Sequence, residues 1–275
     1  MMRIDAHQHF WNYEARRHSW IGEDMKIIRQ DFLPDDLKPI LLENNMDGCI
    51  SVQADQTEME TEFLIELSIA HPFIKGIVAW VDLQSKGVGD RLAYFSKTKI
   101  IRGFRHIVQS EPQGFMLRPD FLGGIGLLEK FNFTYDILVR EFQLPEVLSL
   151  VTLFPNQKFI LDHIGKPDIR FSASNIWRDS IQELGRRENV FCKLSGMVTE
   201  TNFHQWTKEE FYPYLDWVLK CFGIHRLVFG SDWPVCLVSA PYSEVLSIIE
   251  SYFSSFTSSE KEALWGTNAI QFYGI

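Results

Sequence analysis

The chain has 275 residues, 45% of them hydrophobic and 14% aromatic, which suits a folded protein with a sizeable core and not a disordered one. The formal net charge of −9 argues against nucleic acid and anionic membrane surfaces as partners, because both bind basic patches. The N-terminus lacks the layout of a signal peptide and no apolar run approaches 18 residues, so we expect a soluble, cytoplasmic protein.

Eight short apolar runs recur along the chain, each ending in polar or glycine residues. They begin near Arg3, Gly48, Ile74, Ile100, Asn132, Gln157, Asn189 and His225. Between them lie segments with helical periodicity, and a ninth closes the chain. These segments span residues 35–45, 57–70, 87–97, 120–130, 144–154, 176–187, 209–222, 242–253 and 258–270.

A strand followed by a helix, repeated eight times, predicts an α/β fold of the (β/α)₈ TIM barrel type. We expect residues 1–275 to form one such domain. An open, doubly wound sheet is the alternative, but it usually has a glycine-rich turn after its first strand, and this chain has none. The glycines of residues 123–126 lie inside a helical segment, so they are no phosphate-binding fingerprint and predict no nucleotide cofactor.

The first apolar run, residues 3–10, ends in His7-Gln8-His9. Side chains two positions apart share one face of a strand, so both imidazoles should project together at its carboxyl end. Such a pair can hold a divalent metal or polarise a substrate oxygen. The alternative is that both histidines simply fill the core.

The connection after this run is long and aromatic. Residues 11–31 make the first strand-to-strand interval about 20 residues longer than most, and they include Trp11 and Trp20. In a barrel this connection lies on the catalytic face, where long loops often act as lids. A solvated insertion without function is the alternative.

Two later runs end in ionisable residues. Asp162-His163 follows the run near residue 159, and Asp232 follows the run near residue 227. A carboxylate at the end of a buried strand is costly unless it is paired or functional. Asp232 could deprotonate a water while opposing imidazoles orient that water. The alternatives are a helix cap for Asp232 and a core position for His163.

Several cations also follow strand-like runs. Arg102, Arg105 and Arg140 could clamp a carboxylate or polar oxygens, or could form salt bridges to the outer helices. Lys193 could point inward beside Ser195, although a lysine at a strand end is more often solvent-facing. Neither the Gly-x-Ser-x-Gly motif of α/β-hydrolases nor the His-Glu-x-x-His motif of zinc proteases is present.

The four cysteines are not in Cys-x-x-Cys spacing; they are Cys49, Cys192, Cys221 and Cys236. Cys49 and Cys192 lie in apolar runs, so buried free thiols are expected in place of disulfides or a structural zinc site.

The combination of His-x-His, a later His and a final Asp at strand ends resembles the amidohydrolase superfamily over the whole chain. Five motifs, DAHQHFW, RGFRH, DHIGKP, KLSG and FGSDWP, resemble more narrowly the amidohydrolase-related lactonases. They lie at residues 5–11, 102–106, 162–167, 193–196 and 229–234. The resemblance implies hydrolysis of a small lactone, such as L-fucono- or L-rhamnono-lactone, or of a pyrone dicarboxylate lactone.

The chain departs from superfamily members with two metals. They use a carbamylated lysine ending strand four and a histidine ending strand five. Here the fourth run ends in Arg105-His106 and the fifth carries Tyr135-Asp136. The resemblance therefore implies one weakly held or dispensable divalent metal, zinc, with His7, His9 and Asp232 as its ligands.

We interpret Asp232 as the base that activates water, with His163 sharing the proton and with His7 and His9, or zinc held by them, stabilising the oxyanion. The residues expected to grip the lactone are Arg102, Arg105, His106, Asp136, Trp80 and Trp233. Two further hypotheses stay open: a zinc-dependent decarboxylase of the same superfamily, and a barrel that binds a sugar acid without turnover. The oligomeric state is also open, and a homo-oligomer is possible.

Overall fold

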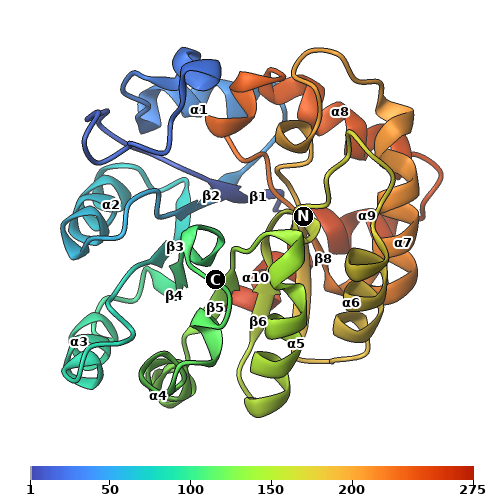
Figure 1. The fold of residues 1–275 in the computed structure, drawn as a ribbon. Coiled ribbons are helices and arrows are strands. Elements are labelled where there is room, and N and C mark those ends of the chain that lie inside the picture. Colours follow the sequence, from blue (N-terminus) through green and yellow to red (C-terminus); the bar gives the residue numbers. More distant parts are fainter. Residues whose placement is uncertain (1) are drawn as a thin grey trace.

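The computed structural model describes residues 2–275, and within them eight parallel strands follow one another around a barrel in chain order (Figure 1). The strands are β1 (Ile4–Gln8), β2 (Gly48–Val52), β3 (Ile74–Ala79), β4 (Ile101–His106), β5 (Thr134–Ile137), β6 (Phe159–Leu161), β7 (Val190–Leu194) and β8 (Leu227–Phe229). A bridge between Gln8 and Trp233 joins the first strand to the segment after the last. The predicted (β/α)₈ barrel is confirmed.

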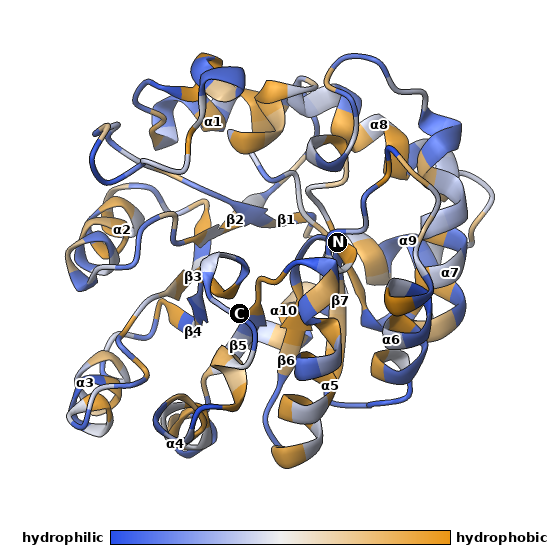
Figure 2. Cartoon of the chain, in the orientation of Figure 1, coloured by the Kyte–Doolittle hydropathy of each residue, from blue (hydrophilic) through white to orange (hydrophobic). Residues whose placement is uncertain are grey.

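Helices fill the intervals between the strands. They are α1 (Pro34–Glu43), α2 (Glu58–Ala70), α3 (Val88–Phe95), α4 (Pro119–Leu128), α5 (Leu144–Leu153), α6 (Asn175–Gly185), α7 (Tyr212–Phe222) and α8 (Tyr242–Tyr252). Figure 2 shows hydrophobic and hydrophilic residues on the same helices, as expected where one face packs on the barrel. Local chemistry explains the starts: α1 begins at Pro34, which lacks an N–H to satisfy, and the Thr57 hydroxyl accepts a hydrogen bond from Glu60 N and so caps α2.

The last helical segment is broken into three pieces, whereas its periodicity predicted one helix. These are α9 (Ser258–Glu262), a π-helical turn (Ala263–Thr267) and α10 (Asn268–Tyr273). Gly266 lies in the π-helical turn, where a Cβ would meet the carbonyl oxygen of Met2 at 1.9 Å. Only glycine allows this close approach of the π-helical turn to the backbone of Met2. The approach places the following helix, α10, against the barrel.

Helix α10 closes the end of the barrel at which the strands begin. Its Phe272 and Tyr273 side chains are buried in one apolar cluster with inward-facing strand residues such as Ile4 and Ile160. The opposite end, where the strands finish, is therefore the end left for a ligand to enter.

The long first connection is ordered and packed. Trp11 and Phe32 exchange two backbone hydrogen bonds of 3.0 and 2.9 Å, and a 3₁₀ helix (Glu23–Ile28) lies between them. Arg17 Nε also donates to Asp55 Oδ2 after β2, at 2.8 Å. These contacts fasten the connection over the carboxyl end of β2, so it is not a loosely solvated insertion.

Cys49, Cys192 and Cys236 are buried and Cys221 is partly buried, and all four are free thiols as predicted. Among the described residues, no helix combines the length and apolar character needed to cross a bilayer.

Candidate active site

The carboxyl ends of β1, β6 and β8 bring the four predicted catalytic residues to one point. The Nε2 atoms of His7 and His9 lie 3.2 Å apart. Asp232 Oδ1 lies 3.4 Å from His9 Nε2, 3.7 Å from His7 Nε2 and 4.0 Å from His163 Nε2. All four side chains are buried. The structure thus places them together, as the strand pattern predicted, while their catalytic roles stay predictions.

Hydrogen bonds across the seam between β1 and β8 fix this geometry. Asp232 N donates to the His7 carbonyl at 2.8 Å. The buried Asp5 carboxylate accepts from the backbone N–H of Ser231 and of His7, and from the Ser231 hydroxyl at 2.6 Å. Burial raises the pKa of Asp5 to about 6, although these donors oppose the rise. At Gly230 a Cβ would lie 2.5 Å from His7 Cβ, so glycine lets the two strand ends approach.

Left-handed backbone conformations occur where β6 and β8 end. The φ angles are 55° at His163, 49° at Ile164, 49° at Lys166 and 59° at Asp232. Each such residue costs of order 1–3 kcal/mol and persists only where its surroundings hold it. Two of these residues are His163 and Asp232, so the backbone strain lies at residues with a predicted catalytic function.

A hydroxyl from the residue after β7, Ser195, orients His163. The Nδ1 atom of His163 lies 2.9 Å from Ser195 Oγ. The next residue, Gly196, has φ of 60°, and a Cβ there would lie 2.3 Å from His163 Nδ1. Burial lowers the pKa of His163 to about 4, against the opposing effect of Asp232. The imidazole is therefore neutral near pH 7 and able to accept or share a proton.

Asp232 keeps its charge in this buried place. Burial alone would raise the pKa of Asp232, but the neighbouring His163 and the hydrogen bond with His9 hold that pKa well below its ordinary value. An ionised carboxylate beside neutral imidazoles can accept a proton from water.

The donor set of His7, His9 and Asp232 fits a divalent metal. His9 Nδ1 lies 2.7 Å from the Val52 carbonyl oxygen, which only accepts, so Nδ1 carries the proton and Nε2 presents a lone pair. The three candidate ligand atoms are 3.2, 3.4 and 3.7 Å apart. Tetrahedral zinc with bonds of 2.0–2.2 Å separates its ligands by roughly 3.3–3.6 Å. His7 also belongs to a second possible cluster, with Asp162 and His163.

Below this cluster lies a buried network of charges. Lys193 of β7 contacts Asp136 Oδ2, Asp162 Oδ1 at 2.9 Å and His7 Nδ1 at 3.1 Å. Arg105 Nη1 donates to Asp162 Oδ2 at 3.0 Å. Burial would raise the pKa of Asp162, but Lys193 and His7 hold it well below the ordinary value. The sequence favoured solvent for Lys193, and it predicted that the Asp162 carboxylate would be paired or functional without naming its partners.

Three residues expected to grip the substrate have other partners in the structure. The expectation is corrected for Arg102, while the roles of Asp136 and Trp233 in binding stay predictions. Arg102 lies near the start of β4 and donates to the Gly274 carbonyl at 2.8 Å, at the closed end of the barrel. Asp136 is fully buried between Lys193 and Tyr273, whose hydroxyl donates to it at 2.7 Å. Trp233 is 1% exposed and packs on Phe10 and Phe32.

The other three residues expected to bind the substrate, Arg105, Trp80 and His106, lie near the open end of the barrel. Arg105 is 3% exposed, and its guanidinium donates to the Gln53 carbonyl as well as to Asp162. Trp80 Nε1 lies 3.4 Å from His106 Nδ1, and His106 Nε2 lies 2.9 Å from Glu111 Oε1. Trp80 and His106 thus form a polar pair at the carboxyl ends of β3 and β4.

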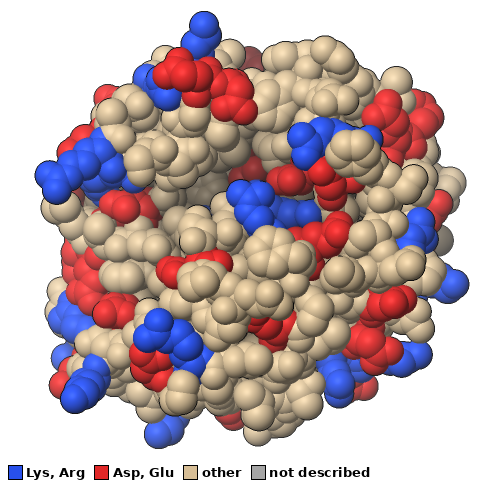
Figure 3. Space-filling model, viewed as in Figure 1, with Lys and Arg blue, Asp and Glu red and all other residues tan. Residues whose placement is uncertain are grey.

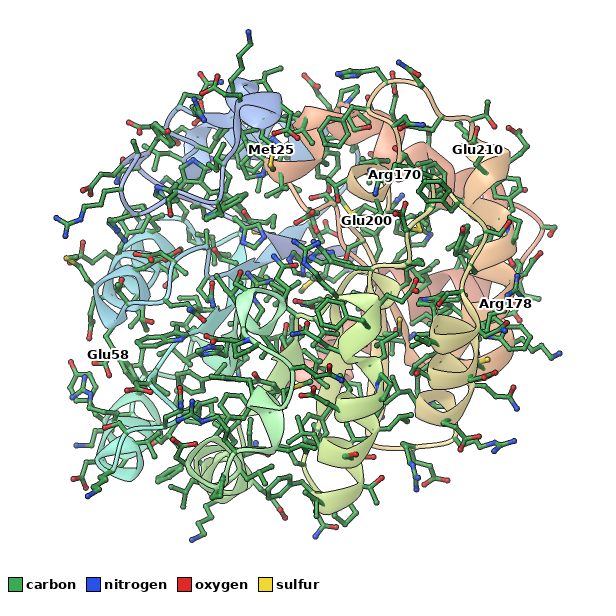
Figure 4. All side chains as sticks on the ribbon, viewed as in Figure 1. Met25, Glu58, Arg170, Arg178, Glu200 and Glu210 are labelled. Atoms are coloured by element: carbon green, nitrogen blue, oxygen red, sulfur yellow. The ribbon has the colours of Figure 1, made fainter. Side chains whose placement is uncertain are left out.

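The rim of the open end carries charged residues that sequence reasoning missed. Lys166, in the turn after His163, pairs with Glu200 at 3.2 Å. Glu200 and Arg170 line a groove of about 440 Å³ that Asp24 of the first connection also borders. Figure 4 shows Arg170 and Glu200 close together, and Figure 3 shows acidic and basic side chains gathered beside the hollow at this face. The DHIGKP motif was the available signal for Lys166.

Comparison with known proteins identifies the family of the chain. The Amidohydrolase family model matches residues 4–275. The whole chain aligns at 39% identity with 96% of an L-fucono-1,5-lactonase from Burkholderia multivorans. In a second alignment, 99% of the chain matches 96% of an L-fucono-1,5-lactonase from Burkholderia ambifaria at 31% identity. A crystal structure of an amidohydrolase from Burkholderia multivorans with bound zinc superposes with a TM-score of 0.96 at 38% identity, covering all of both chains. The chain belongs to the amidohydrolase family.

Proposed function

We propose that this protein is a hydrolase that opens a small sugar lactone, with an L-fuconolactone as the first substrate to test. The observation that carries the proposal is the convergence of His7, His9, His163 and Asp232 on one point at the open end of the barrel. The full-length similarity to two proteins named L-fucono-1,5-lactonase supports the choice of substrate.

Asp232 is the general base in this proposal. Its ionised carboxylate takes a proton from water, and the resulting hydroxide attacks the lactone carbonyl carbon. The neutral His163, oriented by Ser195, helps position that water. Asp232 then returns the proton to the ring oxygen as the carbon–oxygen bond breaks, which leaves an open-chain hydroxy acid.

We propose further that His7, His9 and Asp232 hold one divalent cation, zinc, and hold it weakly. When bound, such a cation supplies Lewis-acid polarisation of the carbonyl oxygen. The lone pair that His9 presents, the spacing of the ligand atoms and the zinc named in the similar crystal structure support the assignment. A lactone is an activated ester, so the weak affinity is compatible with turnover.

The charges near the site favour a neutral sugar lactone over a dicarboxylate lactone. A dianionic substrate would need several arginines facing it. Of the three arginines that the sequence suggested, Arg102 contacts Gly274, Arg140 is exposed, and Arg105 is committed to Asp162 and Gln53.

A panel assay tests the substrate class. Aldonolactones and dicarboxylate lactones are offered in weakly buffered pH indicator, and carbon dioxide release from dihydroxybenzoates is measured in parallel. We expect acid release above the spontaneous rate with aldonolactones. Three outcomes would replace the proposal. Faster turnover of dicarboxylate lactones would indicate a dicarboxylate lactone hydrolase, and release of carbon dioxide would indicate a decarboxylase. Tight lactone binding by calorimetry without turnover would indicate a binding protein.

A further inference from the structure

His7 has an unusual partner for a metal ligand. A metal-bound histidine normally donates its second ring N–H to a carboxylate, a carbonyl or water. His9 follows this rule with the Val52 carbonyl. His7 Nδ1 instead lies 3.1 Å from the ammonium of Lys193, with Asp162 Oδ1 further away at 3.4 Å.

The surroundings of Lys193 orient its ammonium towards His7. An ammonium has three N–H donors and no acceptor. Within the described residues, Lys193 Nζ has two hydrogen-bond acceptors, Asp136 Oδ2 and His7 Nδ1. It also forms an ion pair with Asp162 Oδ1 at 2.9 Å, an oxygen that has no hydrogen-bond partner among these residues. The side chain is fully buried, and Tyr273 of α10 shares the same oxygen of Asp136. His7 Nδ1 is therefore one of the two hydrogen-bond acceptors of the buried ammonium.

This contact decides which nitrogen of His7 carries the proton. A neutral imidazole accepts a hydrogen bond at one nitrogen only. If Nδ1 accepts from Lys193, the proton lies on Nε2, where His9 Nε2 accepts it at 3.2 Å. Arg105 Nη1, 3.3 Å from His7 Nε2, favours the opposite tautomer. The distance from His7 to Lys193, 3.1 Å, is shorter than the distance to Arg105, 3.3 Å. A proton on His7 Nε2 also avoids repulsion between two lone pairs, because it forms a hydrogen bond with His9 Nε2.

We propose that Lys193 holds His7 in the tautomer with its proton on Nε2, and that it thereby weakens the binding of a divalent cation to His7, His9 and Asp232. The inference rests on the metal site proposed above. For the cation to bind, the His7 proton must leave Nε2 and appear on Nδ1, where Asp162 can accept it. Lys193 then loses one of its two hydrogen-bond acceptors, and this loss opposes binding. Lys193 is thus a positioning residue that acts through His7.

Nitrogen NMR of the histidine rings tests the tautomer without any substitution. In the metal-free protein, two-bond ¹H–¹⁵N correlations assign the protonated nitrogen of each imidazole. We expect Nε2–H for His7 and Nδ1–H for His9, with His7 changing to Nδ1–H once zinc is added. Nδ1–H at His7 in the metal-free protein would overturn the proposal.

A paired substitution tests the effect on affinity. Lys193→Met together with Asp136→Asn removes one charge of each sign, so that no new unpaired charge is left at position 136. Asp162 keeps Arg105 and becomes free to accept His7 Nδ1–H. Zinc affinity, measured by competition calorimetry, should rise about 10- to 100-fold, the usual size of effects from partners of metal ligands.

Lys166→Met together with Glu200→Gln is the matched control, because it also removes one charge of each sign, from an ion pair near His163. We expect its zinc affinity to stay within threefold of wild type. An equal gain in the control would assign the effect to the loss of any nearby ion pair and refute the tautomer argument, as would unchanged affinity in the folded Lys193→Met/Asp136→Asn variant. If no variant binds zinc while lactones are still opened, the metal site and this inference fail together and the proposed lactonase activity stands.

Discussion

At the scale of single residues, Ser195 should influence the reaction without touching the substrate. Its hydroxyl lies 2.9 Å from His163 Nδ1 and so orients the ring opposite Asp232. In Ser195→Ala we expect kcat for lactone opening to fall about 3- to 10-fold, the value of one hydrogen bond, with KM nearly unchanged. Steady-state kinetics with thermal unfolding as a check measures both. A raised KM at unchanged kcat would mean that Ser195 contacts the substrate instead.

The residue scale also shows what spacing alone could predict. His7 and His9 followed from the two-residue period of a strand. Asp232 followed from a carboxylate that comes after an apolar run with only the small Gly230 and Ser231 between. Lys193 did not follow, because both faces of a barrel strand are covered and alternation does not tell the interior from the helix layer. Burial of Lys193 depends on Asp136 in β5 and on Asp162 directly after β6.

At the scale of one element, α2 carries a buried acid that couples its stability to pH. Glu60 is 3% exposed and accepts a hydrogen bond from Ala54 N at 2.7 Å. Burial raises the pKa of Glu60 to about 8, from an ordinary value of 4.5. The folded protein therefore binds more protons than the unfolded chain between these values, and its free energy of unfolding should fall as pH rises through that window.

Glu60→Gln should remove this pH dependence while keeping an oxygen to accept from Ala54. We expect urea unfolding of the wild type to show an added loss of up to about 1.4 kcal/mol per pH unit between pH 5 and 8, and the variant to lack it. Glu66→Gln, on the exposed face of α2, serves as the control and should keep the wild-type slope. Identical slopes in all three proteins would show that Glu60 does not titrate in this window.

Element boundaries were predictable where a local signal marks them and not where tertiary contacts decide. Pro34 and Thr57 are local sequence signals for the starts of α1 and α2. The π-helical turn (Ala263–Thr267) has no such signal, because it depends on the approach of Gly266 to Met2 from the other end of the chain. Arg102 was misplaced for a similar reason: its partner, Gly274, belongs to the helix that closes the barrel.

At the scale of the whole molecule, α10 stabilises the barrel by filling its closed end. Phe272 is 2% exposed, and its ring centroid lies 4.9 Å from that of Phe191 on β7. Phe272→Ala should lower the free energy of unfolding by about 3–5 kcal/mol, as expected for a large side chain removed from a core. Leu153→Ala, at a position 56% exposed, is the comparison and should change stability by less than about 1 kcal/mol. Similar losses in both variants would show that α10 is not part of the core.

Asp232 is the residue on which the proposed chemistry of the whole molecule depends, and its replacement by Asn is the most direct test. The measurement is the rate of L-fucono-1,5-lactone opening by wild type and by Asp232→Asn, each corrected for spontaneous hydrolysis and each shown to be folded by circular dichroism. Loss of a general base should lower kcat by about 10²–10⁴-fold. A variant rate within a few-fold of wild type would contradict the account.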